Sequence, residues 1–254
     1  MVHYLNNYKK KPFIPAIQRT STLVSLSLLS ILCFLIAIKN KTIDVSPSYD
    51  SKVKAATLMK TAMDELKNHR MEQSVFIDIE NDPNETGLVG GPYSLITTDE
   101  GDLDAKLTTL DPNFAAVVID LMYQLGLKKN DTVAVLMTGS MPGANIAVLT
   151  ACKALGLNPV TISSIGASQW GANQIDFTWL DMERILFEKE LILSTSIAAS
   201  IGGRNDMGRL LSVKGRNIIL DNIKKHNIKK GTIFSEVLAY FHFYYLFYLQ
   251  LLYI

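Results

Sequence analysis

The sequence predicts an α/β domain, in which helices cover both faces of a parallel sheet in three layers, behind an N-terminal transmembrane helix. Two observations predict this class. An uncharged apolar run occupies residues 21–38, and further along the chain apolar strands alternate with glycine turns and helices. The clearest case is 131–166, where DTVAVLMTG predicts a strand, PGANIAVLTACKALGL a helix and NPVTISSIG a second strand. This βαβ unit predicts parallel strands covered on both faces and joined by a right-handed crossover.

Residues 21–38, STLVSLSLLSILCFLIAI, are predicted to form a membrane anchor. They carry no charge and, at about 1.5 Å per residue, nearly span the hydrocarbon core of a bilayer. A cleaved signal peptide is the competing interpretation, but no small-residue cleavage site follows, and the run passes directly into Lys39. The dense basic cluster in segment 1–20 predicts a cytoplasmic N-terminus and a domain outside the cytoplasm.

Residues 39–50 are predicted to be a linker and residues 51–232 the α/β domain. The domain begins with an amphipathic helix over 51–71, followed by a short strand, VFIDI, at 75–79 and a stretch rich in turn residues. A second amphipathic helix is predicted over 111–127. Its expected buried face consists of Phe114, Val117, Val118, Leu121 and Met122.

The last residues, 233–254, are apolar and rich in tyrosine and phenylalanine. They fit either a second membrane segment, which would make the protein two-pass, or an aberrant, truncated or frameshifted end. In both cases we expect the sheet to lack some of its strands.

Charge and cysteine content exclude some classes of protein. The net charge is +1 and the pI about 7.7, so we expect no nucleic-acid partner. Cys33 lies in the apolar run and Cys152 on a predicted buried helix face, and both are interpreted as packing residues.

The three turns that follow the predicted strands form the candidate ligand site, because ligands of open parallel sheets gather at the carboxyl ends of strands. Glycine lets a backbone approach a ligand closely, and free N–H groups at a helix N-terminus attract carboxylate or phosphate. The candidate binding residues are Gly139, Ser140, Gly143 and Asn145 in the first turn, Gly166, Ser168, Gly171 and Asn173 in the second, and Gly202, Gly203, Arg204 and Asp206 in the third.

Two of these residues have competing interpretations. Ser140 precedes Pro142 and could simply cap the following helix. As a nucleophile it would need a base, yet the four histidines lie outside the turns. Arg204 suits a carboxylate or phosphate and is equally typical of a surface loop. The turns lack the dinucleotide, phosphate-loop and nucleophile-elbow motifs, so no cofactor is predicted.

The acidic residues predict no metal site. DIENDPNE has acids at alternate positions, as a calcium loop does: Asp78, Glu80 and Asp82. However, Pro83 and Val89 occupy the positions that require glycine and glutamate, so these acids are interpreted as solvated loop residues. A later group either brings carboxylates to the second turn or forms an N-cap and a charged helix face: Asp176, Asp181 and Glu183.

Five blocks carry a family resemblance: KAATLMKTAMDELKNHR, DPNETGLVGGPYSLITTDEGDLDAKLTTLDPNFAAVVIDL, TGSMPGANIAVLTACKALGLNPVTISSIGASQWGAN, DFTWLDMERIL and AASIGGRNDMG. In this order they resemble the poly-gamma-glutamate system protein family of membrane-associated bacterial proteins, over about residues 54–226. The resemblance implies a role beside the ligase and membrane subunits that make and move poly-gamma-glutamate, a capsule-like or secreted polyanion of the cell surface. It transfers no catalytic residue.

Two function classes follow. The preferred one is an accessory subunit of poly-gamma-glutamate biosynthesis and export, held to membrane lipid by its anchor. It would bind the anionic polymer, or its partner proteins, through the glycine turns and Arg204. The alternative is an enzyme, a hydrolase or transferase, that acts on the polymer or its precursor through loop acids.

Overall fold

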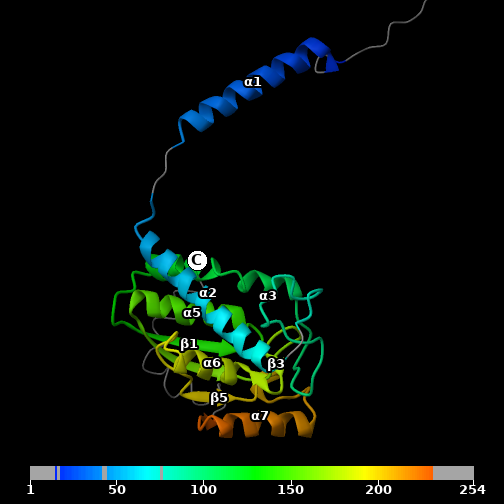
Figure 1. The fold of residues 1–254 in the computed structure, drawn as a ribbon, viewed down its shortest axis with the longest axis vertical. Helices are drawn as coiled ribbons and strands as arrows, with labels where there is room; N and C mark the ends of the chain where they lie inside the picture. Colours follow the sequence, from blue (N-terminus) through cyan, green and yellow to red (C-terminus); the bar gives the residue numbers. More distant parts are fainter. Residues whose placement is uncertain (1–14, 16–17, 42–44, 75–76, 231–254) are drawn as a thin grey trace, which may run out of the picture. The chain divides into compact units, whose positions relative to one another are not determined.

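The computed structural model describes residue 15 and residues 18–41, 45–74 and 77–230 (Figure 1). The greater part of the predicted basic segment 1–20, and the whole tail 233–254, lie outside the described residues. The chain divides into two compact units, Met1–Ser46 and Pro47–Ile254.

The first unit contains α1 (Thr20–Lys39), which extends one residue beyond the predicted anchor at each end. None of its residues is buried, and it is long and apolar enough to cross a membrane. Lys39 lies in its last turn, where a cation complements the helix dipole. Length and composition fit both a membrane anchor and a signal sequence near the N-terminus.

The second unit has the predicted mixed α/β structure with a parallel sheet. The strands of this sheet are β1 (Thr132–Thr138), β2 (Asn158–Ser164), β5 (Ala198–Ser200) and β6 (Lys229–Lys230), in the spatial order β1-β2-β5-β6. The helix α5 (Pro142–Leu155) connects β1 to β2, which pair in parallel with Thr132 opposite Asn158. Both strands end before the glycines that the sequence places at their ends, because those glycines already belong to the turns.

Three helices, α2 (Tyr49–Glu72), α4 (Phe114–Gln124) and α5, pack against one another, and Figure 1 shows α2 lying across α5. Because α2 begins at Tyr49, it takes up the end of the predicted linker. Large, fully buried side chains join these helices: Met59, Leu66, Ile119, Ile146 and Leu149. The predicted buried face of α4 is partly wrong, because Val117 and Leu121 are exposed.

The domain has six further elements among the described residues. They are α3 (Leu103–Thr109), the short hairpin β3 (Asn173–Gln174) and β4 (Phe177–Thr178), α6 (Trp179–Glu188), the 3-10 turn η2 (Arg204–Asp206) and α7 (Val213–Lys225). α6 contributes Trp179 and Leu186 to the first apolar cluster. A second cluster joins α7 to α6 and β5 through Leu180, Ala199, Ile219 and Ile223.

One face of β1 and β2 stays open among the described residues. Met137 and Thr161 are buried, whereas Leu136 is 44% exposed and Val160 is 39% exposed. The sequence predicts that both faces of these strands are covered. In the structure, buried and exposed residues alternate along β1 and β2, because α5 covers one face and no described helix covers the other face as fully.

The predicted strand at 75–79 is wrong where the structure describes it, and residues 75–76 lie outside the described part. The chain turns at residues 79–81. The side chain of Asp78 accepts a hydrogen bond from the Glu80 N–H (3.1 Å), and its carbonyl accepts one from the Asp82 N–H (2.7 Å). These local bonds occupy backbone groups that a strand would use for pairing.

Candidate functional site

The structure places the three predicted turns side by side at the carboxyl ends of β1, β2 and β5. The Ala172 N–H donates to the Gly139 carbonyl (2.7 Å), which joins the second turn to the first. The Gly166 N–H donates to the Ile201 carbonyl (2.8 Å), which joins the second turn to the third. Gly171 lies so close to the first turn that an added Cβ would come within 2.8 Å of the Ser140 backbone. The edge is therefore built from backbone in direct contact.

Ser140 links two turns and does not cap α5, so the helix-cap interpretation is wrong. The N-cap position is Met141, with no side-chain hydrogen bond to the helix. The Ser140 hydroxyl instead accepts a hydrogen bond from the Ser168 N–H (2.9 Å). Among the described residues, the first helical N–H groups, those of Gly143 and Ala144, have no hydrogen-bond partner. They are two of the donors that every α-helix leaves free at its start.

Lys106 is the residue of this site that sequence reasoning missed. It lies on α3, is only 5% exposed, and places its Nζ 2.9 Å from Ser168 Oγ and 3.4 Å from Met141 Sδ. Within the described part of the chain no carboxylate lies at ion-pair distance from it. Burial lowers the pKa of Lys106, and the charge of Asp102 opposes that shift. A single lysine in a turn-rich stretch has no sequence signature that would have indicated this position.

Three predicted binding residues use their side chains to hold the fold. Asn145 donates to the Thr138 carbonyl (2.8 Å). Asn173 accepts from the Gly91 N–H (3.0 Å) and donates to the Gly91 carbonyl (2.7 Å). Asp206 accepts from Ser200 Oγ (2.6 Å) and from the Gly202 N–H (3.0 Å). Their polar atoms fix the turns, and ligand contacts by these side chains remain a prediction.

Arg204 lies at the third turn, where the sequence places it, with Gly203 as the N-cap of η2. Its Nε is 3.3 Å from Asp99 Oδ2, and the two side chains are 64% and 47% exposed. An ion pair this exposed contributes at most about 1 kcal/mol, so an incoming carboxylate could displace Asp99 at little cost.

Gly143 is a packing position, so its substitution tests the stability of the fold. A Cβ there would lie 2.5 Å from the Thr109 carbonyl oxygen at the end of α3. We expect Gly143→Ala to lower the free energy of unfolding by about 1 to 3 kcal/mol, the range for overpacked sites. Urea unfolding of the full chain measures this. Gly126→Ala has no atom within 4 Å to clash with but has a positive φ, so it reports backbone strain without overpacking. A stability unchanged by Gly143→Ala would contradict the close contact.

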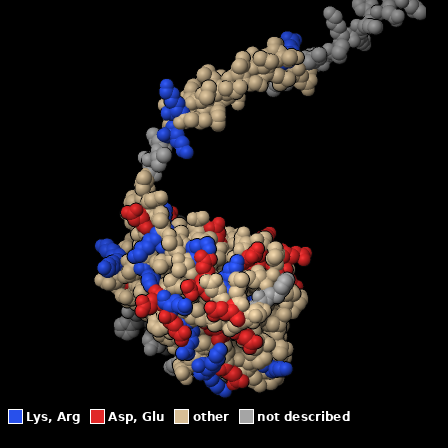
Figure 2. Space-filling model, in the orientation of Figure 1, with Lys and Arg blue, Asp and Glu red and all other residues tan. Residues whose placement is uncertain are grey.

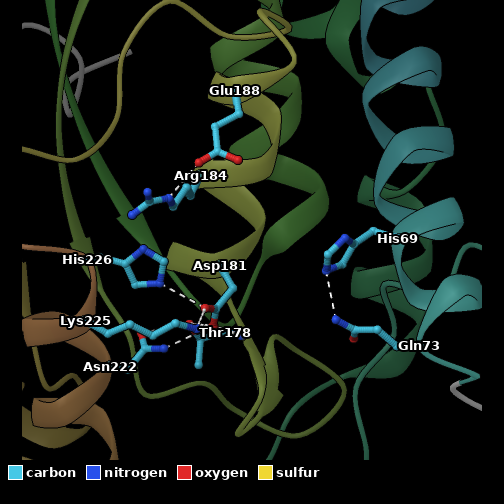
Figure 3. Close-up of polar contacts among 9 residues, drawn as sticks. All are labelled: His69, Gln73, Thr178, Asp181, Arg184, Glu188, Asn222, Lys225 and His226. Carbon is cyan, nitrogen blue, oxygen red and sulfur yellow. Dashed lines mark hydrogen bonds and ion pairs between the residues drawn. The ribbon is translucent and has the colours of Figure 1, made fainter.

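A second polar cluster surrounds Asp181, at the start of α6 (Figure 3). Asp181 is 8% exposed and faces the end of α7. It accepts hydrogen bonds from Thr178, Asn222, Lys225 and His226, at 2.7, 3.1, 2.8 and 2.9 Å. Burial alone would raise the pKa of Asp181, but the bonds from His226, Lys225 and Thr178 together lower it. Thr178 is the N-cap of α6, and Asp181, at the third helical position, completes a capping box by accepting from the Thr178 N–H (2.9 Å).

Glu183 follows on the same helix and is only 1% exposed. Its carboxylate accepts hydrogen bonds from the Ser196 N–H (2.9 Å) and Ser196 Oγ (2.8 Å), and Ser196 Oγ lies 2.7 Å from Ser163 Oγ of β2. Burial raises the pKa of Glu183 to about 7, although the bonds from Ser196 oppose the shift. The third acid of this group, Asp176, is exposed. Neither Glu183 nor Asp181 is a charged residue of a solvated helix face.

The acids of the first loop also have local roles. Asp82 is buried at 1% exposure and accepts hydrogen bonds from Thr86 Oγ1 and from the Gly87 N–H (2.7 Å), so its interpretation as a solvated acid is wrong. Among the described residues, no three histidine, cysteine, aspartate or glutamate side chains are grouped so that they could hold a metal ion.

Comparison of the chain with models of protein families, with curated proteins and with solved structures found no match. The geometry of the site therefore carries the functional argument.

Proposed function

We propose that the protein is a membrane-anchored accessory subunit of poly-gamma-glutamate biosynthesis and export. In this proposal α1 spans the cell membrane, and a three-layer α/β domain outside the cytoplasm binds carboxylates of the polymer at the strand-end turns. The ligase and membrane subunits of the synthesis system are the expected protein partners, as the family resemblance implies.

The observation that carries the proposal is the buried Lys106 with no acidic partner at ion-pair distance among the described residues. Burying an ammonium group is costly unless an anion compensates for the lost water. A carboxylate bound beside the half-buried Ser168 would supply that anion, since a lysine ammonium has three N–H donors. A ligand with a carboxylate on every repeat unit fits this requirement.

Two further features support an anionic ligand. The exposed guanidinium of Arg204 lies on the neighbouring turn, and the free N–H groups of Gly143 and Ala144 begin α5. Figure 2 shows acidic and basic side chains interspersed over the visible face of the domain. Such a mixed surface favours recognition by a few local groups over attraction by a broad field.

Binding of the polymer by the full chain in non-ionic detergent tests the proposal. We expect Lys106→Met to weaken binding of fluorescent poly-gamma-glutamate by about 10-fold or more, since one charge-assisted hydrogen bond contributes about 1.5 to 3 kcal/mol. Fluorescence anisotropy measures the affinity. The matched control is Lys128→Met, because Lys128 is exposed near the amino end of β1, away from the turns.

The same proposal predicts that binding weakens steeply with added salt, because exposed contacts such as that of Arg204 are screened over about 8 Å at physiological ionic strength.

In the producing bacterium, deletion of the gene should stop polymer accumulation at the surface and leave the ligase active. Equal affinities of the wild-type, Lys106→Met and Lys128→Met chains would contradict the assigned site. Unchanged polymer amount and chain length in the deletion strain would contradict the pathway.

The second candidate function is an enzyme that cleaves or transfers acyl groups of the polymer or its precursor. One observation favours it, the contact between Lys106 Nζ and Ser168 Oγ. Of the loop acids that the sequence suggested for this chemistry, Asp82 is buried in its own loop, where it accepts a hydrogen bond from the Gly87 N–H (2.7 Å).

A further inference from the structure

Lys106 Nζ and Ser168 Oγ lie 2.9 Å apart, within the distance over which a general base takes a proton from a nucleophile. We infer that Ser168 and Lys106 form a nucleophile–base pair for acyl transfer, with Ser140 positioning Ser168. The sequence hypothesis of a serine nucleophile considered Ser140 and looked for a histidine base. In the structure the serine with a base is Ser168, and the base is a lysine.

The surroundings of Lys106 suit a base. A lysine can accept a proton only in its neutral form, and burial favours the neutral form over the ammonium. Lys106 is 5% exposed, and no described carboxylate lies within ion-pair distance of its Nζ. Asp102, the N-cap of α3, is the acid whose charge acts on it from farther away and raises its pKa. Burial is the larger influence, so the pKa of Lys106 is lower than that of an exposed lysine.

Ser168 is held in place and remains within reach of a substrate. Hydrogen bonds fix the backbone on either side of it, from the Ala167 N–H to the Ile96 carbonyl (3.3 Å) and from the Gln169 N–H to the Asp99 carbonyl (3.1 Å). Its own N–H donates to Ser140 Oγ (2.9 Å). The residue is half-buried. A nucleophile fixed in this way loses little freedom when a substrate binds.

Donors for a developing oxyanion lie on the adjoining element. Met141, whose Sδ is 3.4 Å from Lys106 Nζ, immediately precedes α5. The free N–H groups of Gly143 and Ala144 follow it in the first turn of that helix. Backbone N–H groups at a helix start stabilise negative charge on a carbonyl oxygen during acyl transfer.

Hydrolysis of an amide by this pair takes two steps, acylation of Ser168 and hydrolysis of the acyl-serine. Ser168 Oγ attacks the carbonyl carbon of an amide while Lys106 takes the hydroxyl proton. The C–N bond breaks, and Lys106 returns that proton to the leaving amine. Water next attacks the acyl-serine and gives a proton to Lys106, the C–O bond to Ser168 breaks, and Ser168 regains its proton from Lys106. The products are an amine and a carboxylic acid.

The choice of an acidic polyamide as the substrate rests on the proposed function, whereas the nucleophile–base pair does not. The two roles also require opposite protonation states of Lys106. Binding of a polyanion by the ammonium should weaken as the pH rises through the pKa of Lys106, and attack by Ser168 should become faster over the same range. Failure of one role can therefore be distinguished from failure of the other.

The test is covalent labelling of the full chain in non-ionic detergent with a fluorophosphonate probe, which reacts with activated serines. We expect one adduct per chain, assigned to Ser168 by peptide mass spectrometry, with a rate that rises with pH. Ser168→Ala should abolish the adduct. Ser194→Ala should leave it unchanged, because Ser194 Oγ is half-buried but bonded to the Pro159 carbonyl (3.0 Å), at the amino end of β2.

A variant of Lys106 distinguishes its role as a base for Ser168 from its role as a cation that binds the polymer. Lys106→Arg keeps a positive charge that does not titrate, so labelling should fall by roughly 100-fold while polymer binding persists. Ser140→Ala should slow labelling by less and leave the pH profile in place, as expected of a positioning residue, and Ser140→Thr should restore part of the rate. Thermal unfolding of each variant establishes that it is folded. No adduct in the folded wild-type chain, an adduct that survives Ser168→Ala, or wild-type labelling of Lys106→Arg would each overturn the inference.

Discussion

Replacing Asp181 with alanine should lower the free energy of unfolding by about 2 to 4 kcal/mol, because several hydrogen bonds to a buried carboxylate are lost together and one such bond contributes about 1.5 to 3 kcal/mol. The Asp181 carboxylate accepts hydrogen bonds from four residues of two elements, and His226, one of the donors, has a side chain only 5% exposed. Without the acceptor, the Thr178 hydroxyl and the Asn222 amide lose a buried partner as well. A typical domain is stable by only about 5 to 15 kcal/mol, so the loss should be evident in urea unfolding.

The matched control is Asp221→Ala on α7. Asp221 and Lys224 form an ion pair whose side chains are 73% and 78% exposed, and removing an exposed pair should change stability by less than about 1 kcal/mol. Lys225→Met tests one donor alone, and because that side chain is 65% exposed we expect a smaller loss than for Asp181→Ala. If Asp181→Ala were no more destabilising than Asp221→Ala, the cluster would not contribute to the stability of the fold.

The wild-type chain should lose stability relative to Glu183→Gln as the pH rises from about 4 to about 8. The pKa of Glu183 is raised from 4.5 to about 7 in the folded state, so the folded protein binds a proton that the unfolded chain has already released. Stability therefore falls with rising pH between these two values. The shift corresponds to about 3 kcal/mol at 1.36 kcal/mol per pKa unit.

Glutamine is the suitable comparison because it is neutral at every pH. Its amide oxygen can accept from the Ser196 N–H, and its amide N–H can donate to Ser196 Oγ. Asp181 and His226 are present in both chains, so the difference between the two unfolding curves isolates Glu183. Denaturant unfolding at about one-unit intervals of pH measures it. Parallel stability curves, or a wild-type chain that gains stability relative to Glu183→Gln above pH 5, would contradict the raised pKa.

Periodicity and turn chemistry predicted the elements whose signals are local. The uncharged run gave α1 to within one residue at each end, and the strand–turn–helix pattern gave β1, α5 and β2. Apolar residues alone predict the strand at 75–79. Where the structure describes this segment, the chain turns instead, and the Asp78 side chain accepts a hydrogen bond from the Glu80 N–H. In α4, Val117 and Leu121 satisfy helical spacing as well as Ala115 and Ile119 do, so only the packing against α2 decides which face is buried.

Side-chain roles at the site were harder to predict because they depend on contacts between distant segments. Lys106 meets Ser168 across 62 positions of the chain, and Asn173 meets Gly91 across 82. Sequence reasoning predicted the three turns and assigned several of their polar side chains to a ligand. In the structure, side chains such as those of Asn145 and Asp206 hold the turns in place through hydrogen bonds, whereas Ser168 contacts Lys106 of α3.

The direct backbone contact between the three strand-end turns has a consequence for motion. The Gly139 carbonyl accepts from the Ala172 N–H and the Ile201 carbonyl accepts from the Gly166 N–H, so neighbouring turns are joined directly by backbone hydrogen bonds. An outward movement of one turn would break these hydrogen bonds, so we expect the three turns to move together. A ligand then meets a surface already in its bound shape, and its association rate is set by diffusion and orientation, with no slow opening step.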